Sequence, residues 1–196
     1  MTRHRIGLAL AAILALSATA VNAQSVAQTS DINDAVKNFH GSPDSLTTMI
    51  SRIERTTGGR VLEIRFTDQD GMPGFRAAVA RGGEVSFIRV AAEQGDAVEL
   101  SQTDLPDWML HWRSRQDVKI ARAAKVSLID AIHTAEQSGN GAPAVAAGIA
   151  ASASNPSGDV KAYNVLLLRG GEIQRVAVDE GNGEVIADPR ALASWP

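Results

Sequence analysis

Cysteine is absent from the 196 residues of this sequence, and aromatic side chains make up only 4% of it. Without cysteine the chain has no disulfide bond, no cysteine to lipidate and no thiol nucleophile, so packing alone must hold the fold together. Because aromatic side chains are few, we expect a core of valine, isoleucine, leucine and alanine, which suits small layered domains.

The sequence also lacks an excess of basic residues, since it contains 19 Lys and Arg and 22 Asp and Glu. Residues 1–23 contain two arginines and no acid, so the chain without them carries 17 − 22 = −5 charges. This mild acidity argues against a nucleic-acid-binding protein, which usually shows a basic face.

The first 23 residues have the pattern of a signal peptide. Arg3 and Arg5 precede the apolar run Ile6–Ala20, and Val21–Ala23 resembles a cleavage site. A membrane anchor is the alternative, but the run is shorter than the roughly 20 residues that span a bilayer. We expect cleavage near Ala23 and a periplasmic or secreted protein without a stable membrane anchor.

Two segments of the remaining chain repeat the same helical pattern. Residues 45–54 align without gaps onto residues 127–136, and both place apolar residues at i, i+3, i+4 and i+7. Each segment therefore predicts an amphipathic helix with one buried stripe. Ser127 and Asp130 resemble a capping box, and Ser42-Pro43 resembles a cap followed by proline at the first helical position.

The sequence after each helix also repeats. Arg81–Val85 aligns with Arg169–Ile173, and Gly95–Val98 aligns with Gly183–Ile186. Apolar residues alternate with polar ones between these points, as in Leu62, Ile64 and Phe66, which predicts half-buried strands joined by glycine-rich hairpin turns. Only the Ala, Ser, Gly and Pro-rich stretch 141–159 departs from the repeat, and there we expect a weaker first strand and a longer loop.

This order of elements resembles the PepSY domain family, which combines an S-L-x-x-A-I-x-x-A-E helix with a closing G-E-V pair of strands. Ser127–Glu136, Gly171–Asp179 and Gly183–Ile186 carry the resemblance most fully, and residues 46–100 carry it with Ala91 or Ala92 in place of a family aspartate. The resemblance implies a non-catalytic protein that inhibits or regulates peptidases. Tandem units of this shape are also similar to the beta-lactamase inhibitor protein, which binds through a concave pair of sheets.

The predicted fold is α+β, with two PepSY-like units that each pack one helix on an antiparallel sheet of about four strands, joined by a linker helix. The predicted boundaries are a signal peptide at 1–23, an N-terminal extension at 24–41, unit 1 at 42–100, a linker helix at 101–126, unit 2 at 127–188 and a C-terminal tail at 189–196.

Residues suited to catalysis or metal binding do not form a recognisable motif. His40, His111 and His133 fall in three different elements without the spacing of a zinc site, and His133 is interpreted as a surface partner of Asp130. The acidic turns at 68–71 and 179–183 lack ligands at both ends of a calcium loop, and G-x-S-x-G is absent. We therefore expect no enzyme activity, no metal site and no cofactor.

The predicted linker helix carries aromatic and basic side chains that suit protein interfaces. The candidate partner-binding residues are Trp108, Trp112, Arg113 and Arg115. The alternative is that the tryptophans pack against one repeat while the charges meet water, which is favoured because aromatic side chains are scarce in this chain.

Two functional hypotheses follow from the sequence. The first is a regulator that binds an envelope or secreted protein, with peptidases as one candidate class, through the sheet face, a strand edge or the hairpin tips. The second is a sensor for a small molecule or ion in a cleft between the two units, with Trp108 and Trp112 as its wall.

Overall fold

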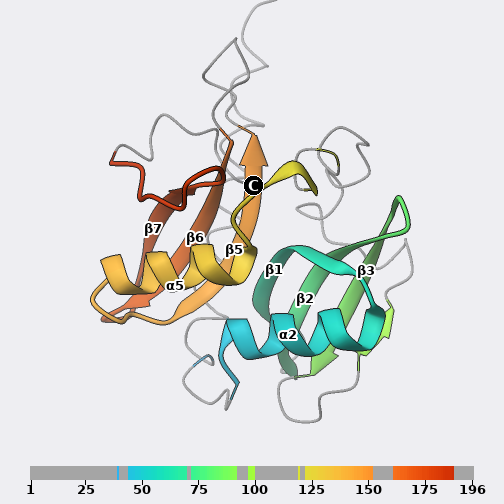
Figure 1. Ribbon diagram of the computed structural model, residues 1–196. Coiled ribbons are helices and arrows are strands. Elements are labelled where there is room, and N and C mark those ends of the chain that lie inside the picture. Colours follow the sequence, from blue (N-terminus) through green and yellow to red (C-terminus); the bar gives the residue numbers. More distant parts are fainter. Residues whose placement is uncertain are drawn as a thin grey trace, which may run out of the picture.

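The computed structural model describes residues 39, 44–69, 72–91, 97–99, 119, 122–151 and 161–187 (Figure 1). A helix followed by strands occurs twice along the chain. The first set is α2 (Leu46–Thr57), β1 (Arg60–Gln69), β2 (Met72–Arg81), β3 (Glu84–Ala91) and β4 (Ala97–Glu99); the second is α5 (Leu128–Ser138), β5 (Ala144–Ala151), β6 (Lys161–Arg169) and β7 (Glu172–Asp179). The α+β class is thus confirmed, whereas residues 101–118 of the predicted linker helix lie outside the described part.

All seven strands belong to one antiparallel sheet in the order β4-β3-β2-β1-β5-β6-β7. The prediction of two units, each with its own four-stranded sheet, is therefore wrong. In each repeat the first strand has one edge whose backbone groups would otherwise stay unpaired. β1 and β5 pair through these two edges. The pairing of β1 with β5, which we call the seam, joins Glu63 to Gly148, Ile64 to Ala147 and Arg65 to Ala146.

The second repeat also differs from the prediction in its strands. Where a fourth strand was expected, Val185 forms only an isolated bridge with Val178. The predicted weakness of the first strand is wrong as well, because β5 pairs with β1 on one side and with β6 on the other. Its small side chains do not weaken β5, since neighbouring strands supply its backbone partners on both edges.

The two helices begin in the same way. Ser45 caps α2 by accepting a hydrogen bond from the Thr48 amide, and Ser127 caps α5 by accepting one from the Asp130 amide. The capping box of Ser127 and Asp130 is confirmed, because the serine hydroxyl also lies 2.6 Å from the Asp130 carboxylate. The helix start predicted at Ser42-Pro43 is wrong: α2 starts after Ser45, whose hydroxyl satisfies an otherwise unpaired amide at the first turn.

The repetition extends to a detail of the backbone. Glu54 at the end of α2 accepts a hydrogen bond from the Val61 amide at 2.9 Å, and Glu136 of α5 accepts one from the Ala144 amide at 3.0 Å. A register shift follows in each strand, between Val61 and Glu63 in β1 and between Ala144 and Ala146 in β5. The two repeats are therefore alike in structure as well as in sequence.

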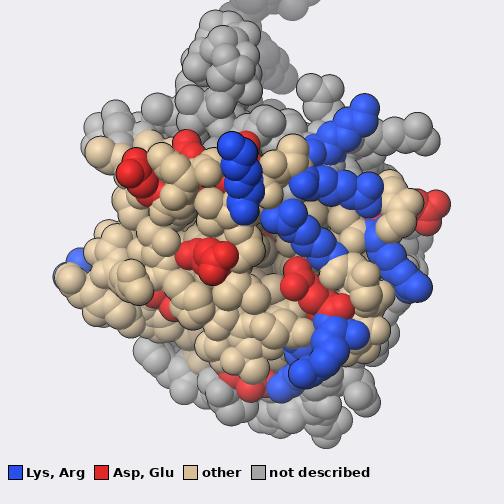
Figure 2. Space-filling view, viewed as in Figure 1, with Lys and Arg blue, Asp and Glu red and all other residues tan. Residues whose placement is uncertain are grey.

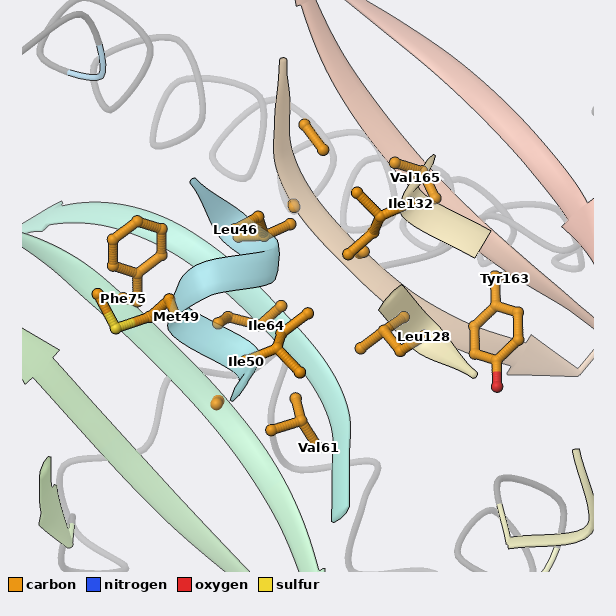
Figure 3. Close-up of a cluster of buried hydrophobic side chains, with 14 of the residues drawn as sticks. Leu46, Met49, Ile50, Val61, Ile64, Phe75, Leu128, Ile132, Tyr163 and Val165 are labelled. Atoms are coloured by element: carbon orange, nitrogen blue, oxygen red, sulfur yellow. The ribbon is translucent and has the colours of Figure 1, made fainter. Parts of the chain in front are cut away.

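One continuous cluster of buried apolar side chains runs through the protein, and a large part of it lies between the two helices and the sheet, on the face that we call the front (Figures 1 and 3). Leu46, Met49 and Ile50 of α2 and Leu128 and Ile132 of α5 are buried there. Figure 3 shows these side chains beside Ile64, Phe75, Tyr163 and Val165 of the sheet. Because both helices contribute to this cluster and contact each other, the repeats share a core as well as a sheet.

Candidate functional site at the seam

The partner-binding residues predicted from the sequence, Trp108, Trp112, Arg113 and Arg115, lie outside the described residues. His40 and His111 lie outside them too. His133 is exposed, and its Nδ1 atom lies 3.9 Å from Glu136 Oε2, so its nearest acid is not the predicted Asp130. Within the described ranges no three His, Asp or Glu side chains group closely enough to hold a metal ion.

The acidic turn after β7 is closed by hydrogen bonds of its own. Asp179 Oδ1 accepts from the Gly181 amide at 2.8 Å and from the Asn182 amide at 3.1 Å. This carboxylate therefore stabilises a turn, in agreement with the interpretation from the sequence.

Charged side chains were expected on the solvent side of β1, but two of them are buried. Ile64 faces the front core, so the alternation of a strand places its neighbours Glu63 and Arg65 on the opposite face, which we call the back. Glu63 is 0% exposed and Arg65 is 4% exposed. Buried charges are costly unless they are paired, so this pair needs a physical account.

Glu63 and Arg65 form a close ion pair along the strand. Arg65 Nη2 lies 2.8 Å from Glu63 Oε1, and Arg65 Nε donates to the same oxygen at 2.9 Å. Burial lowers the pKa of the Arg65 guanidinium, the charge and hydrogen bond of Glu63 oppose this, and the charge of Arg175 acts in the same direction as burial. Glu63 thus favours the charged form of Arg65 inside the protein.

Sheet register places further polar residues of the back face beside this pair. Residues that pair across neighbouring strands share a face. One row across the sheet contains Ala78, Glu63, Gly148, Asn164 and Ala177, and the adjacent row contains Arg89, Arg76, Arg65, Ala146, Leu166 and Arg175. We define the seam site as Glu63, Arg65, Ala146, Gly148 and Asn164.

Asn164 is the most unusual member of the seam site. Its side chain is 0% exposed, and neither its Nδ2 nor its Oδ1 atom has a hydrogen-bond partner among the described residues. A buried polar group without a partner costs about 1–3 kcal/mol. Native proteins keep few such groups, and each calls for an explanation such as a ligand.

The front of the seam is closed by a second polar contact. Tyr163 donates from its hydroxyl to the carbonyl of Val126 at 2.7 Å, and Arg60 Nη2 lies 3.4 Å from that carbonyl and 3.5 Å from the hydroxyl. The Lys125 and Val126 amides both donate to the carbonyl of Glu180. These bonds tie the start of β1 to the entrance of α5 and to the end of β7.

The charges of the front face differ in their surroundings from those of the back face. Figure 2 shows Lys and Arg side chains gathered on the side of α2, with few charges over α5. Arg55, Arg81 and Lys125 on the described surface are exposed. Exposed cations are solvated at little cost, so they need no structural explanation, whereas the buried charges of the back face do.

Tyr163→Phe is expected to lower the free energy of unfolding by about 1 kcal/mol, because the hydrogen bond to Val126 is lost while the ring stays. Burial raises the pKa of the Tyr163 phenol above its ordinary value of 10.0, and Arg60 partly opposes this. The unfolded chain therefore loses the proton first, so this contribution is complete below about pH 10 and is lost as the pH rises through the folded-state pKa.

Ultraviolet absorbance of the phenolate measures this pKa directly, because Tyr163 is the single tyrosine of the chain. The folded protein should titrate above the protein unfolded in urea. A folded-state pKa at or below that of the unfolded protein would contradict the burial of the phenol.

The sequence contained partial signals for the seam site. Asn164 interrupts the apolar run of Tyr163 and Val165–Leu168, which marks a polar side chain in a strand that is buried on both faces. Glu63 and Arg65 alternate with apolar residues and so gave the ordinary pattern of a solvent face. Nothing within the first repeat alone indicates that a second sheet edge will adjoin them.

Comparisons with known proteins do not identify a family. No family model matches the sequence, and no curated protein matches it. Among solved structures, the chain is similar to a crystal structure of a candidate lipoprotein from Clostridium difficile 630, with 11% identity and a TM-score of 0.37 over 72% of this chain and 90% of that chain. A similarity at this level carries no argument about function.

Proposed function

We propose that this chain is an exported, non-catalytic binding protein that takes up an extended segment of another envelope or secreted protein along the outer edge of β7. The pattern of residues 1–23 supports export. Among the described residues, no helix is long and apolar enough to span a membrane. The observation that supports the proposal is the outer edge of β7, which is paired only over its C-terminal half within the described residues.

The C-terminal half of β7 is already paired on its outer side. The carbonyl of Ala177 accepts from the Ile186 amide at 2.9 Å, and the Asp179 amide donates to the carbonyl of Glu184 at 2.8 Å. Because backbone groups alternate along a strand, the amides and carbonyls of Ile173 and Arg175 point to the same outer side. No described strand pairs with them there.

An extended peptide could continue this ladder toward the start of β7. Strand addition gains main-chain hydrogen bonds, and side chains that alternate along the edge give it specificity. Glu172, Gln174 and Arg175 are exposed at this edge. Charges on an edge strand disfavour indiscriminate pairing, so they favour a partner whose own charges are complementary.

A narrower form of this proposal is that the bound partner is a peptidase, which the resemblance to the PepSY family supports. An extended segment near a peptidase active site, or its propeptide, has the backbone that such an edge binds. The narrower form needs its own test, because binding along β7 does not require a peptidase.

Arg175→Pro is expected to abolish this binding while leaving the fold intact. Proline removes the outward amide of residue 175, and the pairing of β7 with β6 uses the opposite side of the strand at Gln174 and Val176. Arg175→Ala is the matched control, because it removes the same charge but keeps the amide.

Partners are recovered from envelope extract on the immobilised wild-type protein and on both variants. A partner that the alanine variant retains and the proline variant loses supports strand addition, and hydrogen exchange should then show the Ile173 and Arg175 amides protected by that purified partner. Equal recovery on all three proteins would rule out the β7 edge. If proteolysis in the extract is unchanged after addition of the wild-type protein, the peptidase form of the proposal is ruled out, but binding along β7 is not.

A further inference from the structure

The chain that returns along the outer edge of β7 has a defined register with that strand. Its hydrogen bonds pair Asp179 with Glu184 and Ala177 with Ile186, and Val185 bridges to the strand between them. In an antiparallel pair, each step forward on one strand corresponds to one step back on the other. The register therefore also predicts which residues after Ile186 would face the unpaired half of β7.

Continuation of this register assigns three residues of the C-terminal segment to positions on β7: Asp188 opposite Arg175, Pro189 opposite Gln174 and Arg190 opposite Ile173. Hydrogen-bonded and non-hydrogen-bonded pairs alternate along an antiparallel ladder. Positions 188 and 190 would thus face the outward amides and carbonyls of β7, and the nitrogen of position 189 would point away from them.

The residue types at these positions suit an added edge strand. Asp188 and Arg175 would lie directly opposite each other, and a cross-strand pair of opposite charges contributes about 0.2–1 kcal/mol. Proline is tolerated on an edge strand where its nitrogen faces away from the ladder, which is the position of Pro189. Proline also restricts the residue before it to extended backbone, so Asp188 is predisposed to a strand.

Ala187 is the point at which this pairing is interrupted. It is exposed, and the chain bends there. In this conformation no described strand pairs with the outer side of Ile173 and Arg175. Straightening of the backbone at Ala187 would continue the register and supply the missing hydrogen bonds.

We propose that residues 187–190, which we call the strap, close over the N-terminal half of β7 in the free protein and open at Ala187 when a partner strand pairs there. The closure itself needs no partner, whereas its regulatory role rests on the function proposed above. A partner then competes with the strap, so its apparent affinity is reduced in proportion to the fraction of molecules in which the strap is open.

Arg190→Pro is expected to open the strap, and Ala191→Pro is its matched control. In the proposed register the amide of residue 190 donates to the carbonyl of Ile173, whereas the amide of residue 191 points away from β7. Hydrogen exchange is measured on the whole chain without a partner. The Ile173 and Arg175 amides should exchange at least about tenfold faster in Arg190→Pro than in the wild type or in Ala191→Pro.

Two further signals test the register and exclude a general loss of structure. The Gln174 amide points toward β6, so its exchange should be the same in all three proteins. Gln174 and Pro189 would form a non-hydrogen-bonded pair, in which the Cα atoms approach most closely. A nuclear Overhauser contact between their α protons should therefore be present in the wild type and absent in Arg190→Pro.

The outcomes separate the strap from the function proposed above. Equal exchange of the Ile173 and Arg175 amides in the wild type and in Arg190→Pro would overturn the strap, even if Arg175→Pro abolishes partner binding. Slow exchange in the wild type without any recovered partner would support closure and count against the proposed function. Where a partner is recovered, Arg190→Pro should retain more of it than the wild type, and equal recovery would overturn the regulatory role.

Discussion

Glu63→Leu is expected to lower the free energy of unfolding by about 3–5 kcal/mol, because it leaves a buried charge without its partner. Glu63 is fully buried, and its Oε1 atom receives both close contacts from Arg65. Leucine would fill a similar volume but leave the guanidinium inside the protein without this partner. Urea unfolding followed by circular dichroism measures the change.

Two further variants show whether the cost comes from the uncompensated charge. The double variant Glu63→Leu with Arg65→Met removes both charges and should recover most or all of the lost stability, as replacement of a buried pair by apolar groups usually does. Arg52→Ala breaks a pair of similar length with Asp44, at 2.9 Å, but those side chains are 30% and 21% exposed, so its cost should stay below about 1 kcal/mol. If Glu63→Leu costs no more than Arg52→Ala, the pair is not buried in solution.

The parts of the fold that could be predicted are those that local pattern determines. The stripes Leu46–Ile53 and Leu128–Ala135 and the serine at position 127 identified two helices and one cap, because helix periodicity and capping depend on neighbouring residues. The hairpins β2–β3 and β6–β7 followed from their repeated glycine pairs, which take positive φ at Gly82, Gly83, Gly170 and Gly171.

The union of the two sheets could not be predicted, because strand pairing between distant segments depends on which edges remain free after each hairpin has formed. β1 and β5 have no sequence feature that marks them as central strands beyond the small residues of Ala144–Ala151. The alternation in β1 assigned Glu63 and Arg65 to solvent, and a pattern of period two cannot distinguish a solvated face from a second buried one.

The union of the sheets also changes which surfaces are available to a partner. Each repeat considered alone would offer the edge of its first strand, and in the whole chain those two edges are used by each other. Among the described strands, the outer edge of β7 remains unpaired over its first half, and a turn that Asp179 stabilises follows the strand. Strand addition is therefore restricted to the ends of the sheet, because the seam uses both inner edges.

Ile50→Ala and Ile132→Ala are each expected to lower the free energy of unfolding by about 2–5 kcal/mol, because they leave cavities at side chains that are 1% and 0% exposed. The two positions are equivalent in the repeat, on α2 and α5. If the repeats folded independently, each change would destabilise only its own half. Since they share a sheet and a core, each change should shift one common transition.

Local reporters in both halves make this distinction measurable. The ring signals of Tyr163 report on the second repeat and those of Phe75 on the first, and both side chains are buried in the common core. In the Ile50→Ala variant, the Tyr163 signal should be lost at the same urea concentration as the Phe75 signal and the circular dichroism. A Tyr163 transition that stays at its wild-type midpoint would show that the three residue pairs of the seam and the bonds of Arg60 and Tyr163 to Val126 are too weak to couple the halves.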